Sequence, residues 1–330
     1  MMETNAAISF DGVGKRFDDT WVLRDIDLDV PPGTIIGMIG PSGSGKTTTV
    51  RLANGYYRAD EGEVRLLGTD PATMPTAQRR SIGYLPQHPV LFDELSLWEN
   101  LNFHASMNGV AFSRRRRLRE LLELVELDGQ EKKLVSESSG GMRRRLALAA
   151  TLVHAPRVLM LDEPTAGIDP ILRRRFWDHF RQLRDDGTTL VITTQYVTEA
   201  AHCDVVAMLA HGQTAAVGSP AELRRQAYGG LELDVRFEQP VDDSVVGLLL
   251  AIDGVKRAEP SDVDVVRVAI DPDVLEASDI APRLGDEFTV AGTAEVATDW
   301  DDVFIELVGA DASDDVEGDA VTADAVGVAP

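Results

Sequence analysis

Residues 34–54 read Thr-Ile-Ile-Gly-Met-Ile-Gly-Pro-Ser-Gly-Ser-Gly-Lys-Thr-Thr-Thr-Val-Arg-Leu-Ala-Asn. The run from 34 to 39 is short and apolar, which predicts a buried strand. A glycine-rich turn follows, then the helix-forming stretch 49–54. The residues from Gly40 to Thr47 match the pattern G-x-x-x-x-G-K-[ST] at every defined position. A strand, a glycine-rich loop and a helix in this order predict a loop that cradles phosphate groups.

Each residue type in this loop has a chemical reason. Glycines let backbone N–H groups turn toward the β- and γ-phosphates of a nucleotide, and the following helix presents its positive end. Lys46 adds a mobile positive charge, and the Thr47 hydroxyl can ligate Mg²⁺. The alternative, a chance glycine-rich turn, is disfavoured by the flanking strand and helix. The predicted nucleotide-binding residues of the loop are Gly40, Pro41, Ser42, Gly43, Ser44, Gly45, Lys46, Thr47 and Thr48.

A second candidate site lies at 158–163, where the apolar run Val-Leu-Met-Leu ends in Asp162 and Glu163. In a parallel sheet this strand end lies beside the phosphate loop. Asp162 could then belong to the coordination shell of Mg²⁺. Glu163 could orient and deprotonate a water for in-line attack on the γ-phosphate. An exposed acidic strand end is the alternative, and the phosphate loop disfavours it.

The chain as a whole predicts an α/β domain followed by a small α+β domain. Strands separated by helical stretches indicate a largely parallel sheet, and between residues 91 and 155 the apolar spacing changes to that of a helical insert. After a hinge at Gly229-Gly230, we expect an α+β domain over 231–308, and the acidic segment 309–330 is expected to be disordered. The strands expected in the first domain, besides 34–39, are Val22–Val30, Glu63–Leu67, Ser81–Leu85, Val158–Leu161, Thr188–Thr193 and Val205–Leu209. In the second domain we expect strands at 231–237, 263–270 and 288–296, helices at 242–252 and 274–284, and an amphipathic turn at 300–307.

Further motifs stand in a fixed order around these sites. The segment Ser138-Ser139-Gly140-Gly141-Met142, followed by a helical stretch, resembles the signature motif of the ATP-binding cassette (ABC) ATPases. Gly167-Ile168-Asp169 resembles the D-loop of that family, and Gln87, which closes Tyr84-Leu85-Pro86-Gln87, resembles its Q-loop. Phe17 stands where the family has an aromatic residue that stacks on adenine. The resemblance covers residues 5 to about 225.

This resemblance implies a P-loop NTPase cassette that hydrolyses ATP with Mg²⁺. Two cassettes, either two copies of this chain or one copy and a homologous cassette, would pack head to tail around two ATP. Ser139, Gly140 and Gly141 of one cassette would then donate to the γ-phosphate held by the other, with Asp169 also at the nucleotide. The implied catalytic residues are Glu163, Gln195 and Gln87, and the implied metal ligands are Thr47, Gln87 and Asp162.

Three positions depart from the family pattern. Ser138 stands where the signature commonly has Leu, and Met142 where it commonly has Gln; neither change removes the phosphate donors. Gln195 stands where the strand end normally finishes in His. A glutamine can donate an amide hydrogen bond but does not change charge near neutral pH. We therefore expect hydrolysis to persist, with little pH dependence from this position.

The resemblance also predicts a partner and a place in the cell. A cassette of this kind recruits a separate membrane permease, so we expect this chain at the cytoplasmic face of the membrane and its docking surface around 89–100. The segments 193–200 and 298–304 resemble those of ABC-2 type exporters, which predicts export. An alternative is an ATP-gated assembly switch acting on soluble partners. The cargo would be selected by the permease, so this sequence does not identify it.

The amino-acid composition narrows the functions that remain possible. The net charge of −23 disfavours a general nucleic-acid or anionic-membrane binder. Residues 230–330 hold 5 basic and 26 acidic side chains, whereas the first 229 residues hold 27 and 29. This acidity, with 5 Lys against 27 Arg, resembles proteins of salt-loving organisms such as halophilic archaea.

Several local features are expected to have ordinary structural roles. The arginine runs at 114–117, 143–145 and 173–175 could form a nucleic-acid surface, but their helical settings favour solvated faces or interface ion pairs, and we expect no nucleic-acid partner. Cys203 is expected to be a small buried residue. No apolar run is long enough for a membrane helix, and the N-terminus carries no secretory signal pattern.

Overall fold

The computed structural model describes residues 6–111, 113–272, 274–284, 288–296 and 299–309. The chain divides into two compact units, Met1–Ala221 and Glu222–Pro330. The predicted disordered tail, apart from Gly309, lies outside the described residues, and so does Thr298. Each unit is described by itself, beginning with the one that carries the phosphate loop.

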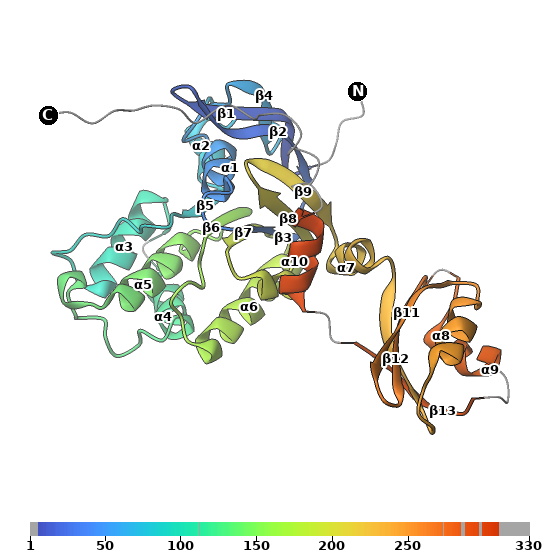
Figure 1. The fold of residues 1–330 in the computed structure, drawn as a ribbon. Coiled ribbons are helices and arrows are strands. Elements are labelled where there is room, and N and C mark those ends of the chain that lie inside the picture. Colours follow the sequence, from blue (N-terminus) through green and yellow to red (C-terminus); the bar gives the residue numbers. More distant parts are fainter. Residues whose placement is uncertain (1–5, 112, 273, 285–287, 297–298, 310–330) are drawn as a thin grey trace, which may run out of the picture. The chain divides into compact units, whose positions relative to one another are not determined.

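The first unit is built on a six-stranded sheet in the order β5-β6-β7-β3-β8-β9 (Figure 1). Neighbouring strands from β5 to β8 are parallel, and β9 is antiparallel to β8. Strands β3, β6 and β7 are buried at every position, as expected for a parallel sheet covered on both faces. The strands are β3 (Ile35–Ile39), β5 (Ile82–Leu85), β6 (Val158–Asp162), β7 (Thr189–Thr194), β8 (Val205–Ala210) and β9 (Gln213–Gly218).

A second, three-stranded antiparallel sheet has the order β2-β1-β4. Its strands are β1 (Ile8–Phe17), β2 (Thr20–Val30) and β4 (Glu61–Leu66). The strands predicted at 22–30 and 63–67 are therefore present, but in this separate sheet. Strand β1 is missing from the prediction, because irregular pairing between Phe10 and Lys15 interrupts its alternation. The inward residues of this sheet join the core beneath the phosphate-loop helix.

Helices cover the large sheet and form a separate group beyond its β5 edge (Figure 1). Helix α1 packs on strands of both sheets, whereas α3 and α4 pack on α5, which also contacts β5. Among the described residues between 91 and 155 no strand is formed. The helices are α1 (Lys46–Ala53), α2 (Thr76–Arg79), α3 (Leu97–Met107), α4 (Arg115–Leu124), α5 (Gly140–Leu152) and α6 (Pro170–Asp185), with 3-10 turns η1 (Val135–Glu137) and η2 (Val197–His202). Helix α7 (Pro220–Tyr228) begins at the end of this unit and belongs mostly to the second.

The second unit contains a four-stranded antiparallel sheet in the order β11-β12-β10-β13. One face of this sheet packs on α8 and α9 through an apolar core. The Arg224 guanidinium lies over the Trp300 ring, 4.9 Å from its centroid, and joins α7 to α10. The elements are β10 (Leu231–Phe237), α8 (Asp243–Leu250), β11 (Val255–Asp262), β12 (Val265–Ile270), η3 (Ala277–Asp279), α9 (Ile280–Leu284), β13 (Val290–Glu295) and α10 (Trp300–Gly309).

Two predictions for this unit were incomplete. Strand β11 was missed, because it is an edge strand in which only Ala258 is buried, so its sequence shows no apolar alternation. The helix predicted at 274–284 is confined to a 3-10 turn and the five residues of α9. Across the described ranges of both units, no helix combines the length and the apolar character needed to cross a membrane.

Candidate nucleotide site

The phosphate loop connects β3 to α1 and depends on glycine. Gly43 and Gly45 have φ values of +84° and +105°, a left-handed conformation that side chains disfavour. A Cβ atom on Gly45 would also lie 2.4 Å from Leu23 Cδ2. The loop therefore folds back on the chain at Gly45, while Gly43 leaves open space on its outer side.

The amino end of α1 is open to an anion. Gly45 is its N-cap and has no side chain to cap the helix, and the first turn contains no acidic residue. The positive end of the helix therefore faces the loop without a capping side chain of its own. This is the arrangement that binds phosphate groups in other helices that follow glycine-rich turns.

Lys46 lies beneath this loop. Its side chain is buried, and Nζ donates to the carbonyl oxygens of Gly40 at 2.7 Å and Pro41 at 2.8 Å. Burial lowers the pKa of Lys46, while the neighbouring Glu163 and Asp162 carboxylates act in the opposite direction. A cation held by two carbonyls can exchange those contacts for phosphate oxygens without losing its hydrogen bonds.

Asp162, at the carboxyl end of β6, lies beside the loop as predicted. Its Oδ1 accepts from Thr47 Oγ1 at 3.1 Å and from Thr193 Oγ1 at 2.5 Å. Its Oδ2 is buried and has no hydrogen-bond partner among the described residues. A hydroxyl and a carboxylate with a free, buried oxygen are ligands that suit Mg²⁺, so Thr47 and Asp162 could hold that ion between them.

Glu163 follows Asp162 and is only partly buried. Its backbone is left-handed, with a φ of +52°. The Glu163 N–H donates to both the carbonyl oxygen and Oγ1 of Thr193, each at 3.0 Å, and its carbonyl accepts from Arg144. Neither Thr193 nor Arg144 was among the predicted site residues.

The proposed adenine position contains an aromatic cluster. Phe17 is partly exposed and packs edge-on against Tyr57, with ring centroids 5.0 Å apart. Tyr57 makes a similar contact with Tyr56 at 5.0 Å. The adjacent pair Tyr56-Tyr57, a few residues after the phosphate-loop helix, was a signal of this cluster that the sequence reading did not use.

Three other predicted site residues, Gln87, Gly140 and Gly141, line a different cleft. Arg144, Ala166 and Gly167 line it with them. The hydroxyl of Ser139 accepts from Met142 N at 3.3 Å and caps α5. This brings the Q-loop, the signature motif and the start of the D-loop to one cleft of the same chain.

Asp169 and Gln195 lie at element ends near these motifs. Asp169 caps α6 by accepting from Ile171 N and Leu172 N at 3.1 and 3.0 Å. Gln195 directly follows β7 and is exposed. Both side chains are thus placed by secondary-structure termini and face outward.

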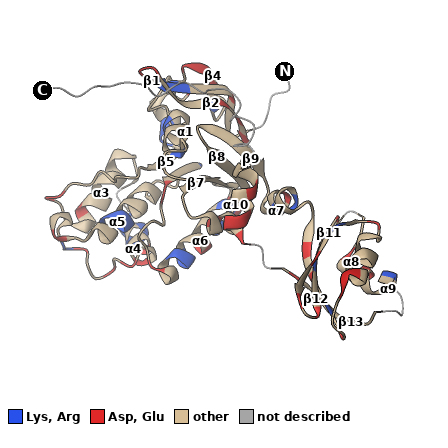
Figure 2. Cartoon of the chain, in the orientation of Figure 1, with Lys and Arg blue, Asp and Glu red and all other residues tan. Residues whose placement is uncertain are grey.

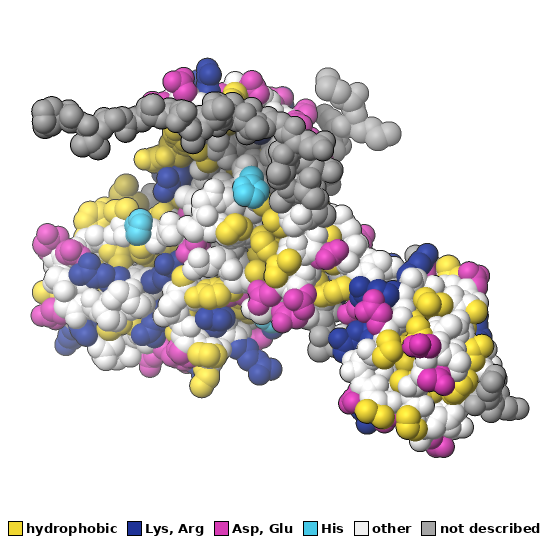
Figure 3. All heavy atoms as spheres, viewed as in Figure 1, with side chains coloured by type: hydrophobic (Ala, Val, Ile, Leu, Met, Phe, Trp, Pro, Cys, Tyr) yellow, Lys and Arg dark blue, Asp and Glu magenta, His cyan; other side chains and the backbone are white. Residues whose placement is uncertain are grey.

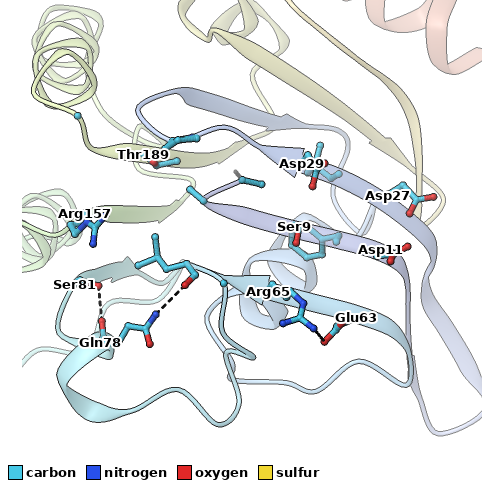
Figure 4. Close-up of a pocket in the computed structure, with 18 of the residues that line it drawn as sticks. Ser9, Asp11, Asp27, Asp29, Glu63, Arg65, Gln78, Ser81, Arg157 and Thr189 are labelled. Carbon is cyan, nitrogen blue, oxygen red and sulfur yellow. Dashed lines mark hydrogen bonds and ion pairs between the residues drawn. The ribbon is translucent and has the colours of Figure 1, made fainter. Parts of the chain in front are cut away.

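A broader cleft in this unit lies away from these groups (Figure 4). It is lined by the antiparallel sheet and by the starts of β5, β6 and β7, including Ser81, Arg157 and Thr189. The catalytic candidates, in contrast, follow the end of β6. Its walls carry Asp11, Asp27 and Asp29 together with the Glu63–Arg65 ion pair of 2.7 Å, and this negative charge disfavours a phosphate there.

The arginine runs are mixed. Arg116, Arg143 and Arg175 form ion pairs with carboxylates, and Arg116 is largely exposed, whereas other members of the runs bind backbone carbonyls. Arg117 of α4 donates to Leu152 O at 2.6 Å and Val153 O at 2.7 Å. Arg144 reaches the carbonyl oxygens of Asp162 and Glu163. Figure 2 marks basic residues along the ribbon of this helical region, and Figure 3 shows basic and acidic side chains mixed over it.

Comparisons with known proteins agree with this geometry. The family model described as "ABC transporter" matches residues 23–166. The chain is similar to the daunorubicin resistance ATP-binding protein DrrA3 of Streptomyces coeruleorubidus, with 40% identity over 76% of this chain and 80% of that protein. It is 34% identical to the daunorubicin/doxorubicin resistance ATP-binding protein DrrA of Streptomyces peucetius, over 93% and 94% of the two chains.

A solved structure of an ATP-binding subunit of an ABC transporter has a TM-score of 0.63 and 26% identity, over 67% of this chain and 93% of that one. The expected α/β P-loop fold with a parallel core is confirmed. The chain therefore belongs to the ATP-binding proteins of ABC transporters and is an ATPase.

Proposed function

We propose that two copies of this chain, or one copy and a homologous cassette, enclose two ATP between them and drive a separate membrane permease that exports its cargo. The observation that carries the proposal is the division of the site into two groups. Lys46 and Asp162 lie at the phosphate loop, whereas Gly140 and Gly141 lie at another cleft beside Gln87. A second cassette, turned head to tail, would bring one group onto the other.

In this proposal the phosphate loop binds the β- and γ-phosphates through its backbone amides and the start of α1. Lys46 exchanges its two carbonyl partners for phosphate oxygens. Thr47 and Asp162 would hold Mg²⁺, which would supply positive charge against the charge that develops on the phosphate oxygens. Gln87, the third expected ligand, lines the other cleft in this structure and would join them only after its loop moves. The free, buried Oδ2 of Asp162 supports this assignment.

Glu163 is the proposed general base. Its carboxylate would accept a proton from the attacking water, and Gln195 at the end of the next strand would donate an amide hydrogen bond toward the γ-phosphate. Strands β6 and β7 are parallel neighbours, with Asp162 paired to Thr193, so both side chains leave the same edge of the sheet. The adjacency of these strand ends supports their joint action.

The second cassette would complete the site. The Ser139 hydroxyl and the N–H groups of Gly140 and Gly141 would donate to the γ-phosphate held by the partner, and Asp169 would lie beside them. In the single chain Gly140 and Gly141 are exposed, which leaves their N–H groups accessible to a partner's nucleotide. ATP then joins the cassettes, and hydrolysis releases them.

The permease would dock beside Gln87. Large apolar side chains are exposed in this region: Val90 is 75% exposed, Phe92 39% and Met107 65%. Phe92 packs edge-on against Phe103, also partly exposed, at 4.7 Å. A patch of this kind suits the contact of a peripheral protein with a partner at the cytoplasmic face of the membrane. Export is supported by the drug-resistance relatives DrrA3 and DrrA.

The dimer is tested with Glu163→Gln, which keeps the shape of the side chain and removes the base. We expect this variant to bind ATP, to elute as a dimer only when ATP and Mg²⁺ are present, and to lose nearly all hydrolysis. Size-exclusion chromatography with light scattering, beside a phosphate-release assay, measures both. Normal phosphate release would refute Glu163 as the base, and a monomer at saturating ATP would refute the sandwich.

The permease is tested by co-purification from membranes of the source cell. A detergent-extracted complex with a multispan membrane protein supports a transporter subunit, and Val90→Asp with Met107→Asp should weaken that complex without changing ATP binding. Recovery in a soluble assembly without any membrane protein would instead favour an ATP-gated switch.

A further inference from the structure

Arg144 connects the signature helix to the end of the catalytic strand. It lies in the second turn of α5, after the signature glycines, and its guanidinium extends to the carboxyl end of β6. One terminal nitrogen donates to Asp162 O at 3.1 Å and also to Glu163 O. Its Nε is buried and makes no hydrogen bond within the described ranges, so the side chain is held by these two carbonyls.

These carbonyls belong to the one strained turn of the site. Glu163 adopts a left-handed backbone, with a φ of +52°, which is unfavourable for a non-glycine residue and persists only where the surroundings hold it. Thr193 binds the N–H of Glu163 from the β7 side. Arg144 binds its carbonyl from the α5 side. The Glu163 peptide is thus held at both ends, and its backbone direction decides where the carboxylate points.

We propose that Arg144 is a positioning residue for hydrolysis, which fixes the left-handed backbone of Glu163 and so aims its carboxylate at the attacking water. This inference rests on the proposed function, because it takes Glu163 as the base. Arg144 also lines the cleft of Gly140 and Gly141, but its guanidinium is bonded to the two carbonyls, so we assign it to the Glu163 backbone and not to the nucleotide. Its effect belongs in the rate of the chemical step and not in the affinity for ATP.

A purely structural role makes a different prediction, and Arg117 provides the matched control. Arg117 also donates to two backbone carbonyls, at Leu152 and Val153, but at the opposite end of α5. Both guanidiniums therefore fasten the same helix by the same kind of bond. Only Arg144 reaches the catalytic strand, so only its loss should change catalysis beyond the loss of stability.

The test uses the full chain with Arg144→Gln, Arg144→Lys and Arg117→Gln. For Arg144→Gln we expect kcat to fall about 10- to 100-fold, while KM and the calorimetric affinity for ATP change less than about threefold. Arg144→Lys keeps a charged donor and should recover part of kcat. Arg117→Gln should lower Tm by a similar amount and keep the wild-type kcat.

Measuring dimerisation separates a loss of catalysis from a loss of support for helix α5. The double variant with Arg144→Gln and Glu163→Gln should form the ATP-dependent dimer at the same ATP concentration as Glu163→Gln alone. The proposal is wrong if Arg144→Gln retains wild-type kcat, if Arg117→Gln loses kcat equally, or if the double variant no longer dimerises. If Arg144→Gln does not fold, an Arg144→Lys kcat equal to wild type with unchanged Tm also overturns it. Failure of the proposed function is distinct, because Glu163→Gln alone would then hydrolyse ATP or stay monomeric.

Discussion

The phosphate-loop group (Lys46 and Asp162) and the signature group (Ser139, Gly140, Gly141 and Asp169) differ in how their polar atoms are bonded. In the first group, Lys46 and Asp162 are buried. Lys46 bonds two carbonyls of its own loop, and Asp162 bonds Thr47 and Thr193 from other parts of the sequence. In the second, Ser139 and Asp169 bond only the first turns of their own helices, and Gly140 and Gly141 are exposed. The first group is therefore organised for nucleotide within one chain, whereas the second is presented outward and needs a second cassette to act on ATP.

The largest expected effect comes from removing the charge in the first group. Lys46→Ala should weaken ATP binding itself by more than about tenfold and abolish hydrolysis, because the loop loses its only side-chain cation for the phosphates. Titration calorimetry measures the affinity. Lys256→Ala in the second unit, which removes a surface ion pair with Asp271 at 3.3 Å, is the matched control and should bind ATP normally. Unchanged affinity in Lys46→Ala would place the phosphates elsewhere.

Asp162→Asn tests the metal side of the same group. The variant keeps the size of the side chain but removes the negative charge that Mg²⁺ requires. We expect Mg²⁺-dependent hydrolysis to fall about 100-fold or more, while ATP binding in EDTA stays close to wild type. Binding titrations with Mg²⁺ and with EDTA measure the difference. An equal loss of affinity under both conditions would mean that Asp162 supports the fold and not the ion.

Ser139→Ala tests the second group and should leave the first intact. The variant should bind ATP as wild type does, but dimerise more weakly and hydrolyse ATP about tenfold more slowly, because a donor to the partner's γ-phosphate is lost. It should also lose about 1 kcal/mol of stability as an N-cap. Ser96→Ala controls for this second loss, since Ser96 caps α3 by accepting from Glu99 N at 3.2 Å. A Ser96→Ala variant that loses activity equally would assign the effect to stability alone.

Features that lie in one continuous motif could be predicted from the sequence, whereas contacts between distant strands could not. The phosphate loop and the carboxylates after β6 were predicted because each is a continuous motif with its own strand. The contacts of Thr193 with Asp162 and Glu163 were not, because they depend on which strand lies beside β6 in the sheet. That neighbour is supplied by residues about thirty positions away.

Arg144 shows a second limit of reading from sequence. A run of arginines predicts a solvated face, yet Arg144 lies one turn before the buried residues Ala147 and Leu148. Spacings of three and four residues share one helix face, so this spacing was an available signal that Arg144 points inward. What it would bind could not be predicted, because the Glu163 turn reaches α5 only through tertiary packing. The irregular strand β1 was missed for a similar reason, since its pairing is defined by its neighbours.

Gln195 carries the smallest expected effect and lies where the two groups would meet. Gln195→Ala should lower turnover about two- to tenfold, the value of one hydrogen bond, with ATP affinity unchanged. Because glutamine does not titrate, we expect the wild-type rate between pH 6 and 8 to show no step from this position. Gln195→His should introduce one, with a midpoint at or above about 6.5, since phosphate charge favours the protonated ring and raises its pKa. The ratio of the Gln195→His rate to the wild-type rate, followed from pH 6 to 8, measures this step. If this ratio does not change with pH and Gln195→Ala keeps the wild-type turnover, the end of β7 does not contact the γ-phosphate. Catalysis in the completed site would then depend on Glu163 and the partner's signature residues alone.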